Sequence, residues 1–340
     1  MITLGIETSC DETSAAVVND DRVLSNLIAT QFVHEEYGGV VPEFASRAHI
    51  RTLMPIISRA LEQADVHISD IDGIAVTQGP GLAGSLLVGV CVAKGLALSL
   101  RVPFIGVNHI EGHIVAVAAS EPHIDYPYIA LVASGGHSML VYIERPFSYQ
   151  LIGQTLDDAA GEAFDKVAKV LALGYPGGPA VEKAAQTGDP AAVPFPRALM
   201  EKDNFNFSFS GLKTAVLYHV RTLRQQNAPI PIADITASFQ RAVVDVLLEK
   251  TMRAVSAFNC RHLVLAGGVI RNSALRAAFE TACAERGIRV RIPTPLLCTD
   301  NAGMIARAGH FRLAAGQSST LDLDVAPNLR LTDMLYEYRP

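Results

Sequence analysis

Short β-rich runs and longer helical runs alternate along the chain, and their order repeats once. In each half, two runs of β-branched and apolar residues flank a short polar turn: residues 2–9 and 14–18, then 129–134 and 138–143. A further strand in each half ends in glycines and opens a long helix: residues 74–81 before 85–98, and 263–268 before 274–284. This repeat predicts a duplicated α/β fold with two halves facing across a cleft.

The two copies differ in length. Ser9 and Ser134 are 125 positions apart, whereas Gly79 and Gly267 are 188 apart, so the second copy has about 63 additional residues. We expect them between Tyr142 and His262, where stretches rich in proline, glycine and phenylalanine break the regular pattern. Helices are expected around this insert at residues 157–173, 212–224 and 232–258, because apolar residues recur there at three-to-four spacing.

Composition narrows the class of protein. With 340 residues, 49% hydrophobic and 18% charged, the chain has enough apolar material for real cores, which excludes a mainly disordered chain. The longest apolar stretch, residues 86–98, contains Lys94 and is shorter than the ~20 residues of a membrane span. The N-terminus lacks the pattern of a signal peptide. We therefore expect a cytoplasmic protein with no membrane partner.

Cysteines and charge exclude further classes. Five cysteines without a CxxC pair fit neither a disulfide framework nor a thiolate zinc site. The formal net charge of −6 argues against a protein that holds nucleic acid alone through a broad basic face.

Several turns contain residues suited to a phosphate or a nucleotide. The turn at residues 8–13 presents hydroxyls and the carboxylates of Asp11 and Glu12, which suit phosphate oxygens held directly or through a cation. The paired glycines of residues 134–136 and of 267–268 let a ligand approach the backbone, and Asn272 adds a donor and an acceptor. Each is equally interpretable as a plain turn.

One glycine pattern is misleading. Residues 79–84 match GxGxxG between a strand and a helix, but about 20 residues later the chain offers Asn108 and His109 instead of the acid that binds a ribose. A dinucleotide-binding dehydrogenase is therefore disfavoured. No GxxxxGK[ST] motif is present, which excludes the usual P-loop.

The sharpest local motif is HIEGH at residues 109–113. On a helix, His109 and His113 lie on one face and can bind one cation, with Asp300 as the candidate third ligand. Glu111 points about 200° away from His109 around the helix, unlike the general base of an HExxH protease. We expect Glu111 to close a capping box with Asn108.

Eight motifs together resemble one family, the universal tRNA threonylcarbamoyladenosine transferases. They are GIETSCDET (5–13), GGVVPEFASRAH (38–49), HIEGH (109–113), SGGH (134–137), DDAAGEAFDK (157–166), YPGGP (175–179), FSFSGLKT (207–214) and CTDN (298–301). The family belongs to the actin, sugar kinase and heat-shock chaperone superfamily. The resemblance thus implies two actin-like halves with RNase H-like sheets: residues 1–126, with a helix at 301–316 packing back on them, and 127–300, with a helical insert at about 174–230.

The resemblance also implies the reaction and the site. An acyltransferase of this family moves the threonylcarbamoyl group from threonylcarbamoyl-adenylate to N6 of adenosine 37, in tRNAs that read codons beginning with A, and AMP leaves. The implied metal ligands are His109, His113 and Asp300, holding one iron or zinc ion. Mg²⁺ is a second candidate ion beside the nucleotide. The implied nucleotide contacts are Val132, Ala133, Ser134, Gly135, Gly136, Asp165, Gly178, Glu182 and Asn272.

The resemblance also concerns the partners of the enzyme, and two rival functions stay open. The resemblance implies tRNA, a related actin-like subunit and a small P-loop ATPase as partners. The apolar helix at residues 53–61 is a candidate docking face for them, and its alternative interpretation is core. Archaeal and eukaryotic relatives have a tyrosine metal ligand where this chain has Val132, so it resembles the bacterial type. Asp11 or Glu12 accepts the N6 proton or holds a cation. The rival functions are a kinase or chaperone of the same superfamily and a metalloprotease, an activity historically attached to the family.

Overall fold

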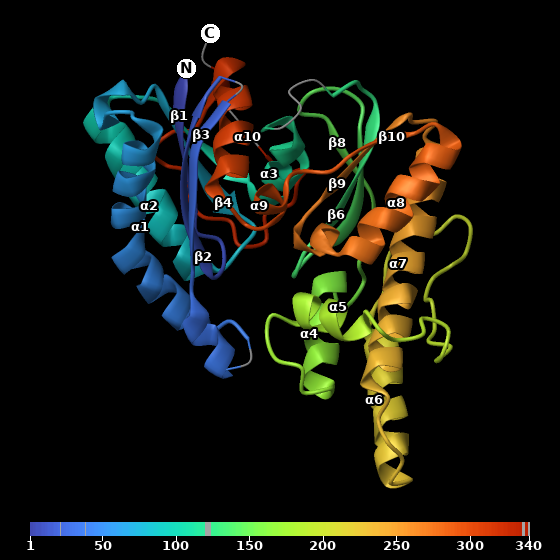
Figure 1. The fold of residues 1–340 in the computed structure, drawn as a ribbon. Coiled ribbons are helices and arrows are strands. Elements are labelled where there is room, and N and C mark those ends of the chain that lie inside the picture. Colours follow the sequence, from blue (N-terminus) through green and yellow to red (C-terminus); the bar gives the residue numbers. More distant parts are fainter. Residues whose placement is uncertain (21, 38, 120–123, 335–336, 339–340) are drawn as a thin grey trace. The chain divides into compact units, whose positions relative to one another are not determined.

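The computed structural model describes residues 1–20, 22–37, 39–119, 124–334 and 337–338 (Figure 1). Gly38, the first residue of one motif quoted above, lies outside them. The chain divides into two compact units, and each is described by itself. Unit 1 comprises Met1–Ile124 and Pro293–Pro340, and unit 2 comprises Asp125–Ile292. Residues 293–300, expected in the second half, therefore belong to unit 1, together with the two histidines of HIEGH.

Unit 1 is built on a five-stranded sheet of order β3-β2-β1-β4-β5. The strands are β1 (Ile2–Glu7), β2 (Glu12–Asn19), β3 (Arg22–Thr30), β4 (Gly73–Gly79) and β5 (Phe104–Asn108). β1 pairs antiparallel with β2, and β2 with β3, whereas β1 pairs parallel with β4, and β4 with β5. The hairpin and the parallel pair therefore share β1 as their central strand.

Helices cover both faces of this sheet. Ile6 and Val17 pack in one buried cluster with residues of α1 (Pro42–Ala64) and α2 (Ala83–Leu100). Alternate strand residues, such as Ala16 and Ala75, pack instead against α10 (Ala302–Ala314). The period of two along each strand separates the two cores.

Unit 2 repeats this topology. Its strands are β6 (Tyr128–Ala133), β7 (Ser138–Ile143), β8 (Tyr149–Gln154), β9 (His262–Ala266) and β10 (Arg289–Arg291), in the order β10-β9-β6-β7-β8. β6 pairs antiparallel with β7 and parallel with β9, as β1 does with β2 and β4. The predicted duplicated α/β fold is confirmed.

The helices of unit 2 are α4 (Ala160–Val170), α5 (Gly177–Ala185), α6 (Ser210–Gln225), α7 (Ile232–Ala257) and α8 (Ser273–Arg286). α4, α5 and α6 lie between β8 and α7 in the chain. The helix expected from residue 157 begins at Ala160, and the carboxylate of Asp157 binds the start of α6 instead. The remaining short elements are η1 (Phe32–Tyr37), η2 (Ile68–Asp70), α3 (His109–Val115), η3 (Ala116–Ala119), η4 (Gly268–Arg271), α9 (Pro295–Cys298), β11 (Gln317–Ser318) and β12 (Glu337–Tyr338).

Of the helices in the described residues, α2 is long and apolar enough to cross a membrane by length and composition alone. In unit 1 its inner face, including Leu86, Val90 and Ala93, is buried. Its outer face exposes Leu87 and Leu98. α2 therefore covers one face of the unit 1 sheet and leaves an apolar stripe outside.

The two acids that precede α4 hold the start of α6. Asp157 Oδ1 accepts hydrogen bonds from the backbone N–H of Phe209, at 2.8 Å, and of Ser210, at 3.2 Å. Its Oδ2 accepts from the hydroxyls of Ser208 and Ser210. Asp158 pairs with Lys166 and Lys213. The motifs DDAAGEAFDK and FSFSGLKT thus meet, and Asp157 supplies the cap that no local side chain gives to α6.

Removing this cap should destabilise unit 2 in a pH-dependent way. Partial burial raises the pKa of Asp157, but the hydrogen bonds from Ser208, Phe209 and Ser210 outweigh it and lower that pKa below its usual value. The stabilisation is therefore present above the unfolded pKa of ~3.9 and is lost as the pH falls through the folded value. We expect Asp157→Asn to lower the unfolding free energy by about 1 kcal/mol at pH 7.

Denaturant unfolding at pH 7 and at acidic pH measures this effect, with Asp203→Asn, an exposed acid outside the cap, as the control. The variant and the wild type should converge as Asp157 becomes protonated. Equal stability at pH 7 would contradict the role of Asp157 as the cap of α6.

Candidate metal and nucleotide sites

The two histidines of HIEGH project from one face of α3. Asn108 caps this helix, since its Oδ1 accepts from the backbone N–H of Ile110 at 2.9 Å and of Glu111 at 3.4 Å. The rings of His109 and His113 lie 4.7 Å apart between centroids. Asp300 follows α9 and places Oδ1 3.5 Å from His109 Nε2 and 3.2 Å from His113 Nε2. The three side chains thus meet at one point of unit 1.

This cluster fits a metal ion. The candidate ligand atoms of His109, His113 and Asp300 all lie within 4.8 Å of one another. His113 is fully buried, and within the described residues neither of its ring nitrogens makes a well-formed hydrogen bond, although Asp300 Oδ1 lies 3.2 Å from Nε2. A buried polar atom without a partner is costly, and a cation at this point would supply one. Two imidazoles and one carboxylate form a donor set that suits iron or zinc.

A fourth residue, Glu7, supports the cluster from the end of β1. Its side chain is buried, and Oε2 lies 3.1 Å from His109 Nδ1. Thr77 of β4 donates its hydroxyl hydrogen to the same oxygen at 2.6 Å, and the backbone N–H of Ser9 donates to Oε1. Since a carboxylate only accepts, Nδ1 carries a proton, and Nε2 is the ring nitrogen that faces Asp300 and that a metal ion would bind.

The charges of the cluster depend on one another. Burial raises the pKa of Asp300, but His109 outweighs it and holds that pKa well below the usual value. Burial lowers the pKa of His109, yet Asp300 and Glu7 outweigh it and raise that pKa well above the usual value. Burial lowers the pKa of His113. In the metal-free protein, a positive charge on His109 therefore lies between two carboxylates.

Only half of the expected capping box forms: Asn108 Oδ1 accepts from the backbone N–H of Glu111, but the Glu111 side chain is used elsewhere. Its carboxylate accepts from Arg312 instead, with Nε 2.8 Å from Oε1 and Nη2 2.7 Å from Oε1. Both side chains are buried, so this ion pair joins α3 to α10 inside unit 1. Charged groups are rarely buried without a partner, and Arg312 supplies that partner from a distant part of the sequence.

Asp11 lies in the turn between β1 and β2, and Glu12 is the first residue of β2; both are partly buried. Burial raises the pKa of Glu12 to about 10, with Asp300 and Asp11 adding to the effect. Glu12 therefore lies within electrostatic reach of the metal cluster. The proton-accepting role of Asp11 or Glu12 stays a prediction.

In unit 2, the turn at Ser134, Gly135 and Gly136 packs against the start of α4. The backbone N–H groups of Gly161 and Glu162 donate to the carbonyls of Ser134 and Gly135, each at 3.2 Å. A Cβ at Gly135 or Gly136 would meet open space. Val132 and Ala133 precede the turn as the last two residues of β6, and their side chains are buried.

The remaining predicted nucleotide residues join the helices around this turn. Asp165 of α4 accepts from the backbone N–H of Gly177, at the start of α5, at 2.7 Å. Glu182 of α5 accepts from the backbone N–H and the hydroxyl of Ser273, at the start of α8. Asn272 caps α8 and donates to Gln240 of α7 at 2.7 Å. These side chains therefore have structural partners in addition to any ligand.

The two glycines before Asn272 differ in what they do. Gly267 has a φ of +93°, and an added Cβ would collide with the carbonyl of Ala133. Gly268 has no such constraint, and an added Cβ there, as at Gly178, would meet open space. The fold thus needs Gly267, whereas Gly268 leaves room for a ligand.

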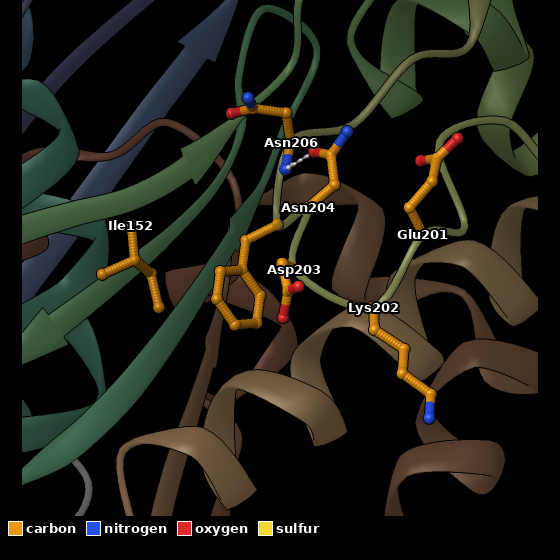
Figure 2. Close-up of a pocket in the computed structure, with 7 residues that line it drawn as sticks. Ile152, Glu201, Lys202, Asp203, Asn204 and Asn206 are labelled. Atoms are coloured by element: carbon orange, nitrogen blue, oxygen red, sulfur yellow. Dashed lines mark hydrogen bonds between the residues drawn. The ribbon is translucent and has the colours of Figure 1, made fainter.

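A pocket of about 470 Å³ in unit 2 lies apart from these residues (Figure 2). Its lining combines Ile152 of β8 with Glu201, Lys202, Asp203, Asn204, Phe205 and Asn206. It contains none of the predicted site residues.

The sequence interpretation missed Glu7, Gln240, Ser273 and Arg312. A signal was available for Glu7 alone, because a charged residue in an apolar strand implies a buried partner.

The comparisons with known proteins agree with the motifs. The family model described as tRNA N6-adenosine threonylcarbamoyltransferase matches residues 22–307. A protein of that name from Geobacter sp. (strain M21) is 54% identical over 329 residues, which is 96% of each chain. The chain belongs to this family. The prediction made from the eight motifs is thereby confirmed.

Solved structures support the fold alone. Full-length HypF in its phosphate- and nucleotide-bound form matches with a TM-score of 0.60 and 14% identity, over 91% of this chain and 45% of that one. The activator of the 2-hydroxyisocaproyl-CoA dehydratase from Clostridium difficile with bound ADPNP matches with a TM-score of 0.52 and 14% identity, over 91% and 94%. Both are consistent with a duplicated actin-like fold.

Replacing Glu7 should weaken metal binding by this family member. In Glu7→Gln, one orientation of the amide turns its NH₂ toward the Ser9 N–H. The other turns it toward His109 Nδ1 and forces the imidazole proton to Nε2, where a ligand lone pair is needed. We expect the affinity for Zn²⁺ to fall about 10- to 100-fold, as for other partners of metal-bound histidines.

Competition with a chelator of known affinity measures this change. Glu43→Gln removes an exposed charge of α1 as a control, and His113→Ala sets the level for loss of a direct ligand. Unchanged affinity in a folded Glu7→Gln variant would contradict the role of Glu7.

Proposed function

We infer that this chain transfers the threonylcarbamoyl group from threonylcarbamoyl-adenylate to N6 of adenosine 37, in tRNAs that read codons beginning with A, and releases AMP. The observation that carries the inference is the family match over residues 22–307. This range includes all three residues of the metal cluster, His109, His113 and Asp300. Such an enzyme acts on tRNA and belongs in the cytoplasm.

The metal proposed at this cluster is iron or zinc. When bound, it acts as a Lewis acid that makes a carbonyl or phosphate oxygen more electron-withdrawing. Among the described residues, His109, His113 and Asp300 would hold the ion, and an oxygen of the substrate would complete its coordination. Glu7 fixes the ring of His109, and the pair of Glu111 and Arg312 fixes the helix that presents both histidines.

Unit 2 is proposed to hold the adenylate. The backbone of residues 132–136, the open space at Gly178 and Gly268, and the polar side chains of Asp165, Glu182 and Asn272 support this assignment. The solved structures of HypF, in a nucleotide-bound form, and of the dehydratase activator, with bound ADPNP, share the fold. Mg²⁺ is a candidate companion of the phosphate.

The reaction requires one proton transfer. N6 of the adenine attacks the carbamoyl carbon, the bond from that carbon to the AMP oxygen breaks, and one N6 proton must leave. Asp11 or Glu12 is proposed to accept this proton or to hold a cation. Backbone N–H groups of Gly135 and Gly136 are proposed to stabilise the charge that develops on the phosphate of AMP, whereas that of Ser134 already donates to the carbonyl of His137 at 2.7 Å.

The structure disfavours the protease alternative. A metalloprotease of this type needs a carboxylate base beside the histidine pair, and Glu111 is held by Arg312 inside unit 1. For a kinase or chaperone of the superfamily, the name shared by the curated relatives gives no support.

The net negative charge and the pairing of basic residues support the proposal that tRNA binding needs a partner protein. The net charge is −6, Lys213 is paired with Asp158, and Arg289 lies 3.6 Å from Asp125. Basic residues already paired contribute less to binding phosphates. We propose weak tRNA binding by the chain alone and productive binding with a related actin-like subunit and a small P-loop ATPase.

Most apolar residues of the helix at residues 53–61 are not a docking face for such a partner. Leu53, Ile56, Ile57, Ala60 and Leu61 are buried in unit 1, so the alternative core interpretation is correct. The outward positions of α1 and α2, including Ile50, Met54, Leu87 and Leu98, are exposed instead. We propose this apolar helix surface as the contact for the actin-like subunit.

Substitution at Gly268 tests the nucleotide assignment. Gly268→Val should weaken AMP binding at least tenfold, because its side chain enters the space proposed for the ligand, while the unfolding free energy stays within about 1 kcal/mol. Gly267→Val should instead destabilise the fold. Calorimetry with AMP and denaturant unfolding measure the two effects. Unchanged AMP affinity in Gly268→Val would exclude this location.

Substitution at Leu87 tests the partner surface. Leu87→Lys should weaken association with the actin-like subunit at least tenfold, because it places a charge in an apolar interface. Leu151→Lys, at a comparably exposed leucine of β8, is the matched control. Analytical ultracentrifugation of both variants with the subunit measures association, and equal affinities would rule out this face of α2.

A further inference from the structure

The turn that carries Asp11 and Glu12 is held at three consecutive carbonyl groups by three different elements. The carbonyl of Ser9 accepts from the backbone N–H of Leu82 at 2.8 Å, and that of Asp11 accepts from the backbone N–H of Gln31 at 3.2 Å. Between them, the carbonyl of Cys10 lies 2.9 Å from His49 Nε2. Only this middle contact is made by a side chain, so it alone depends on the identity of a residue.

His49 has a defined protonation pattern. It is fully buried on α1. Because a carbonyl only accepts, Nε2 carries the hydrogen, and Nδ1 then accepts from the Thr13 hydroxyl at 2.8 Å. Burial lowers the pKa of His49, although the Cys10 carbonyl and the charges of Glu7 and Asp11 act in the opposite direction and His34 adds to the lowering. The neutral ring thus joins the start and the end of the turn.

The same turn connects the contact between His49 and Cys10 to the metal ligands of unit 1. Ser9 places its hydroxyl oxygen 3.2 Å from His109 Nδ1, and its backbone N–H donates to Glu7. Glu12, at the other end, responds to the charge of Asp300. A shift of the Cys10 peptide would therefore displace both the proposed proton acceptors and the neighbours of the metal ligand.

We propose that His49 is a positioning residue for the transfer reaction: its hydrogen bond to the Cys10 carbonyl fixes the turn that presents Asp11 and Glu12. The proposal gives a role to the last residue of GGVVPEFASRAH, which the reaction scheme leaves unassigned. It rests on the proposed function, since it concerns the residues assigned there to the N6 proton.

Two variants separate this role from simple packing. In His49→Gln, the amide nitrogen reaches the position of Nε2 and keeps the bond to Cys10. In His49→Asn, the shorter amide reaches only the position of Nδ1 and keeps a partner for Thr13. Ser25→Ala is the control for a lost buried hydrogen bond, because Ser25 binds the carbonyl of Ala60 on the same helix, away from the turn.

The experiment measures single-turnover transfer with the partner proteins, Zn²⁺ content, and amide hydrogen exchange of Leu82 and Gln31. We expect His49→Asn to lower the transfer rate about 10- to 100-fold, the range for a misplaced catalytic group, with a smaller change in KM. Exchange at both amides should rise at least tenfold. His49→Gln and Ser25→Ala should stay within about threefold of the wild type in rate and exchange.

Other results would overturn the proposal. Equal rates for the Gln and Asn variants, or slow exchange at Leu82 and Gln31 in His49→Asn, would show that the Cys10 contact does not position the turn. Failure of the proposed function is distinguishable: the wild-type protein itself would then produce no modified adenosine, whereas the exchange measurement would still report on the turn.

Discussion

A carboxylate buried at the end of β1 is the constraint on which unit 1 depends. Burying an ionised Glu7 is costly unless each of its oxygens is hydrogen-bonded. The donors come from the following turn, from Thr77 of β4 and from His109 of α3. Satisfying Glu7 therefore fixes a strand pair, a turn and the first metal ligand together, and the ion pair of Glu111 with Arg312 fixes the far side of α3.

The duplicated sheet has been put to different uses in the two units. In unit 1, the turn after the first strand carries acids and is held by its carbonyls. The equivalent turn in unit 2, after β6, carries Gly135 and Gly136 and receives the start of α4. The same topology thus gives one turn suited to a cation and to proton transfer, and another suited to close approach of a nucleotide.

The periodicity of apolar residues in the sequence predicted those parts of the fold that depend on neighbouring residues in the chain. The strands, the duplication and the facing histidines follow from periods of two and of about 3.6 residues, and Asp300 from its ligand type. The partners of Glu111 and Asp157 lie 201 and about 52 residues away in the chain, and no spacing rule reveals them. Periodicity also identifies the apolar face of α1 without showing what covers it, which is why residues 53–61 were open to two interpretations.

Modification of tRNA by this chain is proposed to require a metal ion in the cluster of unit 1. The direct measurement is single-turnover transfer to a tRNA transcript, with the partner proteins and threonylcarbamoyl-adenylate present, followed by mass spectrometry of the nucleosides. The metal-stripped protein should give no modified adenosine, and one equivalent of iron or zinc should restore it together with release of AMP. Transfer at the full rate by the metal-free protein would contradict the account.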